Sequence, residues 1–133
     1  MSIAQRLLAP TRVLIVDDDV ELAQSLAAMI LAAGNFETRM VHCADDAVAA
    51  AVEFPPFIVF LDIELPDMSG YDVAKLLHQQ AQLRTARLIA LTDNIEHPAR
   101  EDARAAGFER YLVKPVTVAE LQKVLKRRFG IVR

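Results

Sequence analysis

A run of five apolar residues at positions 57–61 constrains the fold of this chain more than any other feature. Two prolines precede the run, and a loop that contains Pro66 and Gly70 follows it. A short apolar run between such breakers is typical of a strand buried on both faces, as in a parallel sheet. Asp62 then stands at the carboxyl end of the strand, where ligands bind in open α/β sheets. Asp62 is therefore a candidate site residue.

The composition indicates which classes of protein this chain can belong to. With 133 residues, of which 53% are hydrophobic and 25% charged, the chain fits one compact domain. No apolar stretch approaches the roughly 20 residues that span a bilayer, so we expect a cytoplasmic protein that does not enter the membrane. The net charge of -3 gives no reason to expect direct nucleic-acid binding. The single cysteine, Cys43, excludes a disulfide framework and a multi-cysteine metal site.

Strand patterns and helix patterns alternate five times along the chain. The predicted strands cover residues 12–16, 38–43, 57–61, 88–91 and 111–113, the second being an edge or partly covered strand. Such alternation implies a parallel sheet with right-handed crossovers and helices on both faces. We therefore predict an α/β fold of flavodoxin-like (βα)5 type, a three-layer sandwich with the strand order 2-1-3-4-5.

The helix patterns differ in strength. The first predicted helix has Leu22, Leu26, Met29 and Ile30 on one face and ends at Gly34, for which a left-handed conformation is expected. The second begins at Asp45 or Asp46, and the third covers residues 71–80 with Val73, Leu76 and Leu77 inward. The fourth, from His97-Pro98 to Gly107, has only small inward residues, so it should be the least firmly held. Thr117 and Glu120 have the capping-box spacing and open the last helix.

Polar residues stand where the predicted strands end. They are Asp17, Asp18, Asp62, Thr92 and Lys114. Each acid alone could merely cap the following helix, but the five together should converge on one edge of the sheet. Carboxylates so close repel each other unless a cation neutralises them. Oxygen ligands with room for water favour Mg²⁺ over Ca²⁺, which predicts a magnesium site.

The same residues suit phosphoryl transfer. The carboxylate of Asp62 can attack phosphorus and form an acyl phosphate. A metal ion and the Lys114 ammonium would neutralise charge on the transferring oxygens, and the Thr92 hydroxyl can donate to one of them.

On these residues the chain resembles the receiver domain of two-component response regulators. The resemblance covers residues 12–129 and includes the acidic pair Asp17-Asp18, Asp62 with Leu65-Pro66 and Gly70 after it, Thr92, and Tyr111 before Lys114-Pro115. We expect residues 1–11 to be an N-terminal extension or linker remnant and residues 130–133 a C-terminal tail. Similarity to stand-alone regulators and to the C-terminal receiver of hybrid histidine kinases leaves both origins open.

The resemblance implies a mechanism. Asp62 would accept a phosphoryl group from a phosphohistidine of a sensor histidine kinase or a histidine phosphotransfer protein. Asp18, Asp62 and the backbone carbonyl of Glu64 would bind Mg²⁺ directly, and Asp17 would bind it through water. Such a phosphoacceptor assists its own phosphorylation and dephosphorylation and turns over no external substrate.

The resemblance also implies a switch. Thr92 would move toward the phosphate, and Tyr111 would turn inward behind it. The surface of the fourth helix, fifth strand and last helix would then change its preference for a downstream partner. The Lys114-Pro115 bond would be cis. A homodimer through the same surface is possible, but no residue pattern in the sequence supports it.

One position departs from the family. The residue after the switch threonine is usually small, whereas here it is Asp93. We hypothesise that Asp93 slows phosphorylation or weakens the phosphorylated state; the alternative is that it points to solvent. Glu64 and Asn94 occupy positions that tune dephosphorylation in this family, and the sequence does not indicate in which direction.

Two other functions are weighed. A phosphorylation-independent interaction module stays open because of Asp93. A Mg²⁺-dependent aspartyl-phosphate phosphatase of the haloacid dehalogenase kind would need a second aspartate two positions after the nucleophile, and this chain has Glu64 there.

Overall fold

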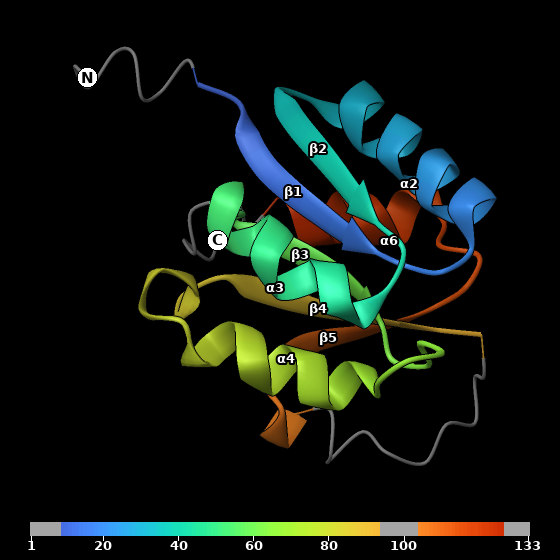
Figure 1. The fold of residues 1–133 in the computed structure, drawn as a ribbon. Coiled ribbons are helices and arrows are strands. Elements are labelled where there is room, and N and C mark those ends of the chain that lie inside the picture. The colour runs from blue at the N-terminus through green and yellow to red at the C-terminus, as the bar shows by residue number, and fades with distance from the viewer. Residues whose placement is uncertain (1–8, 94–103, 127–133) are drawn as a thin grey trace.

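Five parallel strands form a single sheet in the computed structural model, which describes residues 9–93 and 104–126 (Figure 1). The strands are β1 (Thr11–Val16), β2 (Phe36–Val41), β3 (Ile58–Asp62), β4 (Arg87–Thr92) and β5 (Phe108–Val113). Their order in the sheet is β2-β1-β3-β4-β5, and every neighbouring pair is parallel. The predicted flavodoxin-like sheet is confirmed, with the reversal of strand order between β1 and β3.

Helices cover both faces of the sheet. They are α2 (Val20–Ala33), α3 (Ala44–Glu53), α4 (Gly70–Gln79) and α6 (Val118–Leu125), with a short 3-10 helix η1 (Ala81–Leu83). Of the described helices, α3 and α4 pack on one face and α2 and α6 on the other (Figure 1). These three layers are those predicted from the alternating pattern.

The central strand β3 is buried along its whole length. Val59 and Leu61 pack in the core beneath α3 and α4, whereas Ile58 and Phe60 pack in the core beneath α2 and α6. Successive side chains of a strand point to opposite faces, so a strand covered on both sides must be apolar at every position. The uninterrupted apolar run is explained by this place in the sheet.

The second strand begins two residues earlier than predicted. It covers Phe36–Val41, so His42 and Cys43 belong to the loop that follows. Phe36 is buried in the core beneath α2, and the backbone N–H of Thr11 donates to the carbonyl of Asn35, which aligns β2 with β1 from their first residues. The strand lies at the edge of the sheet, as predicted.

Charged residues surround Phe54, which follows α3. The guanidinium carbons of Arg12 and Arg39 lie 5.2 Å and 4.7 Å from the centroid of its ring. Arg39 also pairs with Glu53 at 2.8 Å, and Arg12 lies 3.9 Å from Glu37 on β2. The edge of the sheet at β2 therefore carries alternating charges beside an aromatic ring that is itself buried.

Two details of the predicted helices are wrong. Gly34 ends α2 with φ 163°, which is extended backbone and not the left-handed conformation. Leu76 is 37% exposed, because Val73 and Leu77 form one inward row of α4 and the second row is formed by the small residues Gly70 and Ala74. In α2, Leu26 and Ile30 are buried, and alanines at 23 and 27 complete the inward face, while Leu22 and Met29 are half-buried.

The second predicted helix begins at Ala44, one residue before Asp45, whereas two other helix ends agree with their sequence signals. The Thr117 hydroxyl accepts from the Glu120 N–H, and the Glu120 carboxylate accepts from the Thr117 N–H, so the capping box is formed. Gly107 has a φ of 105°, the left-handed region in which glycine is favoured. Most of the predicted fourth helix lies outside the described residues.

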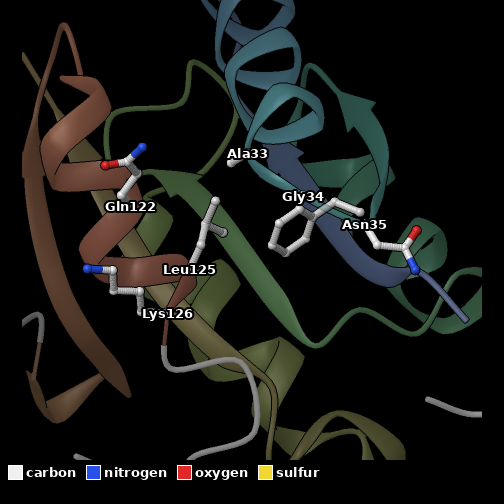
Figure 2. A pocket seen from close by; sticks show the side chains of 7 residues that line it. Ala33, Gly34, Asn35, Gln122, Leu125 and Lys126 are labelled. Carbon is white, nitrogen blue, oxygen red and sulfur yellow. The ribbon is translucent and has the colours of Figure 1, made fainter. Parts of the chain in front are cut away.

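A hollow of about 580 Å³ lies between the ends of α2 and α6 (Figure 2). Phe36, one of its lining residues, begins β2, whereas Asp62 ends β3. Because the strands are parallel, this hollow lies at the end of the sheet opposite to Asp62. In the described part of the chain, no helix has the length and apolar character needed to cross a membrane.

Candidate functional site

Strand register brings the predicted site residues together. Val16 pairs with Leu61, so Asp17 follows β1 beside the position of Asp62. Asp62 pairs with Leu91, and Thr92 pairs with Val113, so Thr92 and Lys114 extend the same row across β4 and β5. The backbone alone therefore gathers side chains from four strands at one edge of the sheet.

Lys114 forms ion pairs with two buried carboxylates. Its Nζ lies 2.9 Å from Oδ2 of Asp17 and 3.1 Å from Oδ2 of Asp62. Asp17 is fully buried and Asp62 is 4% exposed. Burial alone would lower the pKa of Lys114, but the hydrogen bond and charge of Asp17, together with Asp62, raise it above the ordinary lysine value. The ammonium thus stays charged at neutral pH.

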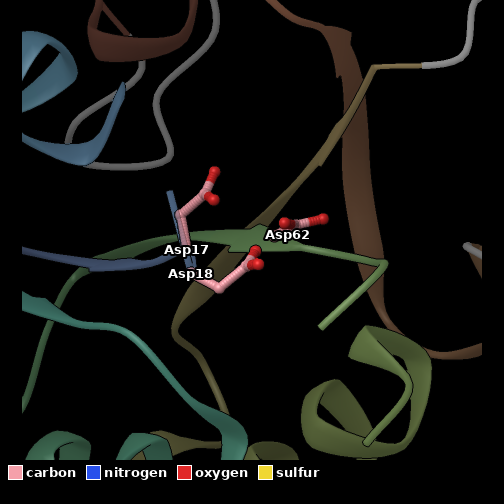
Figure 3. Close-up of side chains that lie close together, drawn as sticks. All are labelled: Asp17, Asp18 and Asp62. Atoms are coloured by element: carbon pink, nitrogen blue, oxygen red, sulfur yellow. The ribbon is translucent and has the colours of Figure 1, made fainter. Parts of the chain in front are cut away.

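A third carboxylate completes an acidic cluster. One carboxylate oxygen from each of Asp17, Asp18 and Asp62 lies within 4.8 Å of the other two, and Figure 3 shows the three side chains close together. Partial burial and a hydrogen bond with Asp62 raise the pKa of the Asp18 carboxyl. One lysine ammonium cannot neutralise three carboxylates, so the cluster favours a further cation. Its donors are all oxygens, the set that hard ions such as Mg²⁺ prefer, so the residues present fit this ion.

Glu64 connects two residues of the site. Its backbone N–H donates to Oδ1 of Asp62 at 2.8 Å, and its Oε1 accepts a hydrogen bond from Oγ1 of Thr92 at 3.3 Å. Thr92 is fully buried, whereas Glu64 is exposed. The side chain of Glu64 therefore reaches back over the carboxyl end of β4 from the loop after β3.

Asp93 lies at the mouth of the site. It is exposed and lines a cleft of about 500 Å³ whose other lining residues are Asp18, Asp19, Leu22, Asp62, Glu64, Lys114 and Pro115. Five carboxylates and one ammonium thus surround this cleft. Asn94 lies outside the described residues.

The remaining predicted residues lie on or beside β5. Tyr111 is half-buried and packs against the core beneath α3 and α4. The Lys114-Pro115 peptide bond is cis.

The sequence matches a known protein family over most of its length. The profile of the response regulator receiver domain matches residues 13–126, most of the chain. The chain belongs to the response regulator receiver domain family. It is accordingly a receiver domain of two-component systems, and the predicted resemblance is confirmed.

Known receivers resemble this one in sequence and in structure. The polar-differentiation response regulator DivK of Brucella anthropi is 32% identical over 121 residues, which cover 91% of this chain and 98% of DivK. The chemotaxis protein CheY4 of Vibrio cholerae has a TM-score of 0.83 and 26% identity, covering 91% of this chain and all of CheY4.

A third similar protein comes from a sensor kinase. The receiver domain of sensor histidine kinase PA1611 from Pseudomonas aeruginosa PAO1 has a TM-score of 0.82 and 31% identity, covering 92% of this chain and 100% of that one. Its structure has a magnesium ion coordinated in the active site cleft. This receiver is therefore similar both to a response regulator and to the receiver domain of a sensor kinase.

Two contacts of the receiver were not predicted from the sequence. His42, in the loop after β2, places Nδ1 2.9 Å from the carbonyl oxygen of Asp17. Asp67, in the loop after β3, accepts from the backbone N–H groups of Ala44 at 3.0 Å and Asp45 at 3.1 Å. Asp67 thus caps α3 from a distant loop and joins the segment after Asp62 to the neighbouring helix. Neither residue has a local sequence signal, because each partner lies more than twenty positions away.

Replacing Asp67 by asparagine is expected to lower the melting temperature of the receiver by roughly 3 °C at pH 7, because the amide keeps only one of the two acceptor oxygens and loses the charge. The N–H groups of Ala44, and then of Asp45, hold the pKa of Asp67 below its usual value of 3.8. A depressed pKa stabilises the fold above pH 3.8, and this contribution disappears as the pH falls through the lower pKa of the folded state. Thermal melts of both proteins between pH 7 and 3 should therefore converge at the acid end. A constant difference at every pH would contradict the assignment.

Proposed function

We propose that this receiver accepts a phosphoryl group on Asp62 from the phosphohistidine of a sensor histidine kinase or histidine phosphotransfer protein. The observation that carries the proposal is the pairing of the Asp62 carboxylate with the Lys114 ammonium at 3.1 Å inside a cluster of three aspartates. Membership of the receiver family supports the same role. We propose that the receiver domain covers residues 12–129. We also propose that it is cytoplasmic, because histidine kinases and phosphotransfer proteins donate phosphoryl groups there.

The chemistry assigned to Asp62 is nucleophilic. A carboxylate oxygen attacks phosphorus, a P–O bond forms, the P–N bond to the donor histidine breaks, and the imidazole leaves with the bonding electron pair. Lys114 would neutralise charge on the transferring oxygens, and the Thr92 hydroxyl would donate to one of them once the phosphoryl group is in place. The ion pairs already hold Lys114 and Asp62 in the required neighbourhood.

Magnesium would be held by this chain's own oxygens. We assign Asp18, Asp62 and the backbone carbonyl of Glu64 as direct ligands and Asp17 as a ligand through water. When bound, the ion neutralises negative charge on the phosphoryl oxygens. The buried Asp17, whose Oδ1 accepts from the N–H of Asp19, keeps the loop after β1 in position.

We propose that phosphorylation is read out at the β5 side of the domain. Thr92 and Tyr111 stand on adjacent strands, and movement of the threonine toward Asp62 would leave room for the tyrosine to turn inward. The surface of the fourth predicted helix, β5 and α6 would then change its preference for a downstream partner. We further propose that Asp93 slows phosphorylation, that Glu64 and Asn94 tune dephosphorylation, and that the domain assists both reactions.

The test is intact mass after incubation with Mg²⁺ and acetyl phosphate. We expect one phosphoryl group on the wild type, none on Asp62→Asn, and none when Mg²⁺ is removed by a chelator. Asp72→Asn is the matched control, because Asp72 is an exposed acid in the first turn of α4, outside the cluster. An adduct that persists on Asp62→Asn would refute the assignment. If the wild type binds Mg²⁺ but gains no adduct, Asp93→Ala should gain one; if it does not, obstruction by Asp93 is wrong.

A further inference from the structure

We propose that Glu64 is a latch on the switch threonine: its carboxylate holds the Thr92 hydroxyl in the unphosphorylated receiver, and a phosphoryl group on Asp62 displaces it. The inference rests on the proposed function, since it assigns a step that accompanies phosphorylation of Asp62. It makes Glu64 a positioning residue that acts through Thr92. The latch would set how readily the unphosphorylated domain adopts its active arrangement.

The first observation is the hydrogen bond itself. Oγ1 of Thr92 donates to Oε1 of Glu64 at 3.3 Å. A hydroxyl has a single proton to donate, so a threonine that donates to Glu64 cannot donate to a phosphoryl oxygen at the same time. The two bonds are therefore alternatives. Because Thr92 is fully buried, its hydroxyl cannot exchange the bond to Glu64 for one to bulk water.

The second observation is how the backbone of Glu64 is held. Its N–H donates to Oδ1 of Asp62 at 2.8 Å, and the residue forms an antiparallel bridge with Ser69 across the loop. The carboxylate is thus aimed from a backbone anchored directly on the phosphoacceptor. A change in bonding or charge at Asp62 acts on Glu64 through this anchor.

The third observation is charge. A phosphoryl group brings between one and two negative charges into a cleft already lined by Asp18, Asp19, Glu64 and Asp93. The buried carboxylates of Asp17 and Asp62 cannot move away from the cleft. Glu64 is exposed, so its side chain can turn to solvent. Repulsion of the Glu64 carboxylate would free the Thr92 hydroxyl at the moment when a phosphoryl oxygen becomes available to accept from it.

This latch differs from simple repulsion of the phosphoryl group. If Glu64 acted only through its charge, its removal would have the same effect whether or not residue 92 carries a hydroxyl. A latch instead requires the two residues to be coupled. Asp93 supplies the comparison, because it is an exposed acid that carries the same charge and lines the same cleft.

The experiment is a pair of double-mutant cycles that measure the affinity for beryllofluoride, a tetrahedral anion that imitates a phosphoryl group, in the presence of Mg²⁺. Glu64→Ala should tighten binding about fivefold when Thr92 is present, the ratio expected for one hydrogen bond. In the Thr92→Val background it should tighten binding less than about twofold. Asp93→Ala should have the same effect in both backgrounds. Equal effects of Glu64→Ala in both backgrounds, or weaker binding, would overturn the latch.

A second readout does not depend on anion binding. Without beryllofluoride, Glu64→Ala should shift the NMR resonance of the Thr92 methyl group more than Glu64→Gln does, because glutamine keeps an oxygen that can accept from the Thr92 hydroxyl. If neither substitution shifts the Thr92 methyl resonance, the contact between Glu64 and Thr92 is refuted. If the wild type fails to bind beryllofluoride through Asp62, the proposed function fails, while the methyl resonance still decides whether Glu64 holds Thr92.

Discussion

Replacing Gly70 by alanine is expected to destabilise the receiver by about 3 kcal/mol, the upper range for overpacking a filled site, and to slow phosphorylation of Asp62. Gly70 begins α4, and its N–H donates to the carbonyl of Ile63 at 3.1 Å. A Cβ atom at this position would collide with the carbonyl oxygen of Asp62 and the Cα atom of Ile63. Both are backbone atoms at the end of the buried central strand. The helix or the phosphoacceptor must therefore shift.

Denaturant unfolding would measure the change in stability, and intact mass over time would measure phosphorylation. Gly34→Ala is the control, because the added Cβ atom there would meet the side chain of Phe36 at 3.2 Å and the backbone is already extended. We expect the control to lose less than about 1 kcal/mol, since a side chain can give way where backbone cannot. A Gly70→Ala protein as stable and as quickly phosphorylated as the wild type would show that the start of α4 is not tightly packed on Asp62.

Replacing Lys114 by methionine is expected to tighten Mg²⁺ binding about tenfold, while slowing phosphorylation about 100-fold. The ammonium lies about as close to Asp17 and Asp62 as a hydrogen bond allows, at 2.9 Å and 3.1 Å. It therefore competes with a metal ion for the same negative charge. Its loss favours the ion but removes a cation that would stabilise the transferring phosphoryl oxygens.

Calorimetric titration with Mg²⁺ and the time course of phosphorylation separate these two effects. Lys75→Met is the matched control, because Lys75 is an exposed lysine of α4 and its replacement should alter neither quantity. Weaker Mg²⁺ binding in Lys114→Met would contradict the prediction. It would mean that Lys114 helps Mg²⁺ to bind by holding the carboxylates in position, and that this effect exceeds its competition with the ion. Unchanged phosphorylation would remove Lys114 from the transfer step.

The sheet and the core of the site follow from strong local patterns in the sequence. A strand such as β3, apolar at every position before its last residue, has no stable place except the middle of a parallel sheet. Once the strands are parallel and their order is known, their carboxyl ends coincide, which brings Asp17, Asp62, Thr92 and Lys114 together without further information. Burial then produces the ion pairs, because charged groups must pair when water is excluded.

Loops and helix faces were harder to predict. Asp67 caps α3 across 22 or more positions, and Glu64 reaches Thr92 across 28, so both contacts depend on how separate loops fold over the sheet. The second strand begins two residues before the predicted one, because its apolar pattern is weak at an edge. Leu76 was predicted to point inward because it is apolar, whereas the small residues Gly70 and Ala74 allow α4 to approach the sheet closely.

The charges on the edge strand β2 affect whether another strand can add to the sheet there. A strand at the border of a sheet offers a row of backbone groups to which a strand of another molecule can add, which is a route to aggregation. Here Glu37 and Arg39 project from that border and are engaged by Arg12 and Glu53, so an incoming strand would have to disrupt or desolvate these charges. The charged border therefore makes the addition of a further strand at that edge unfavourable.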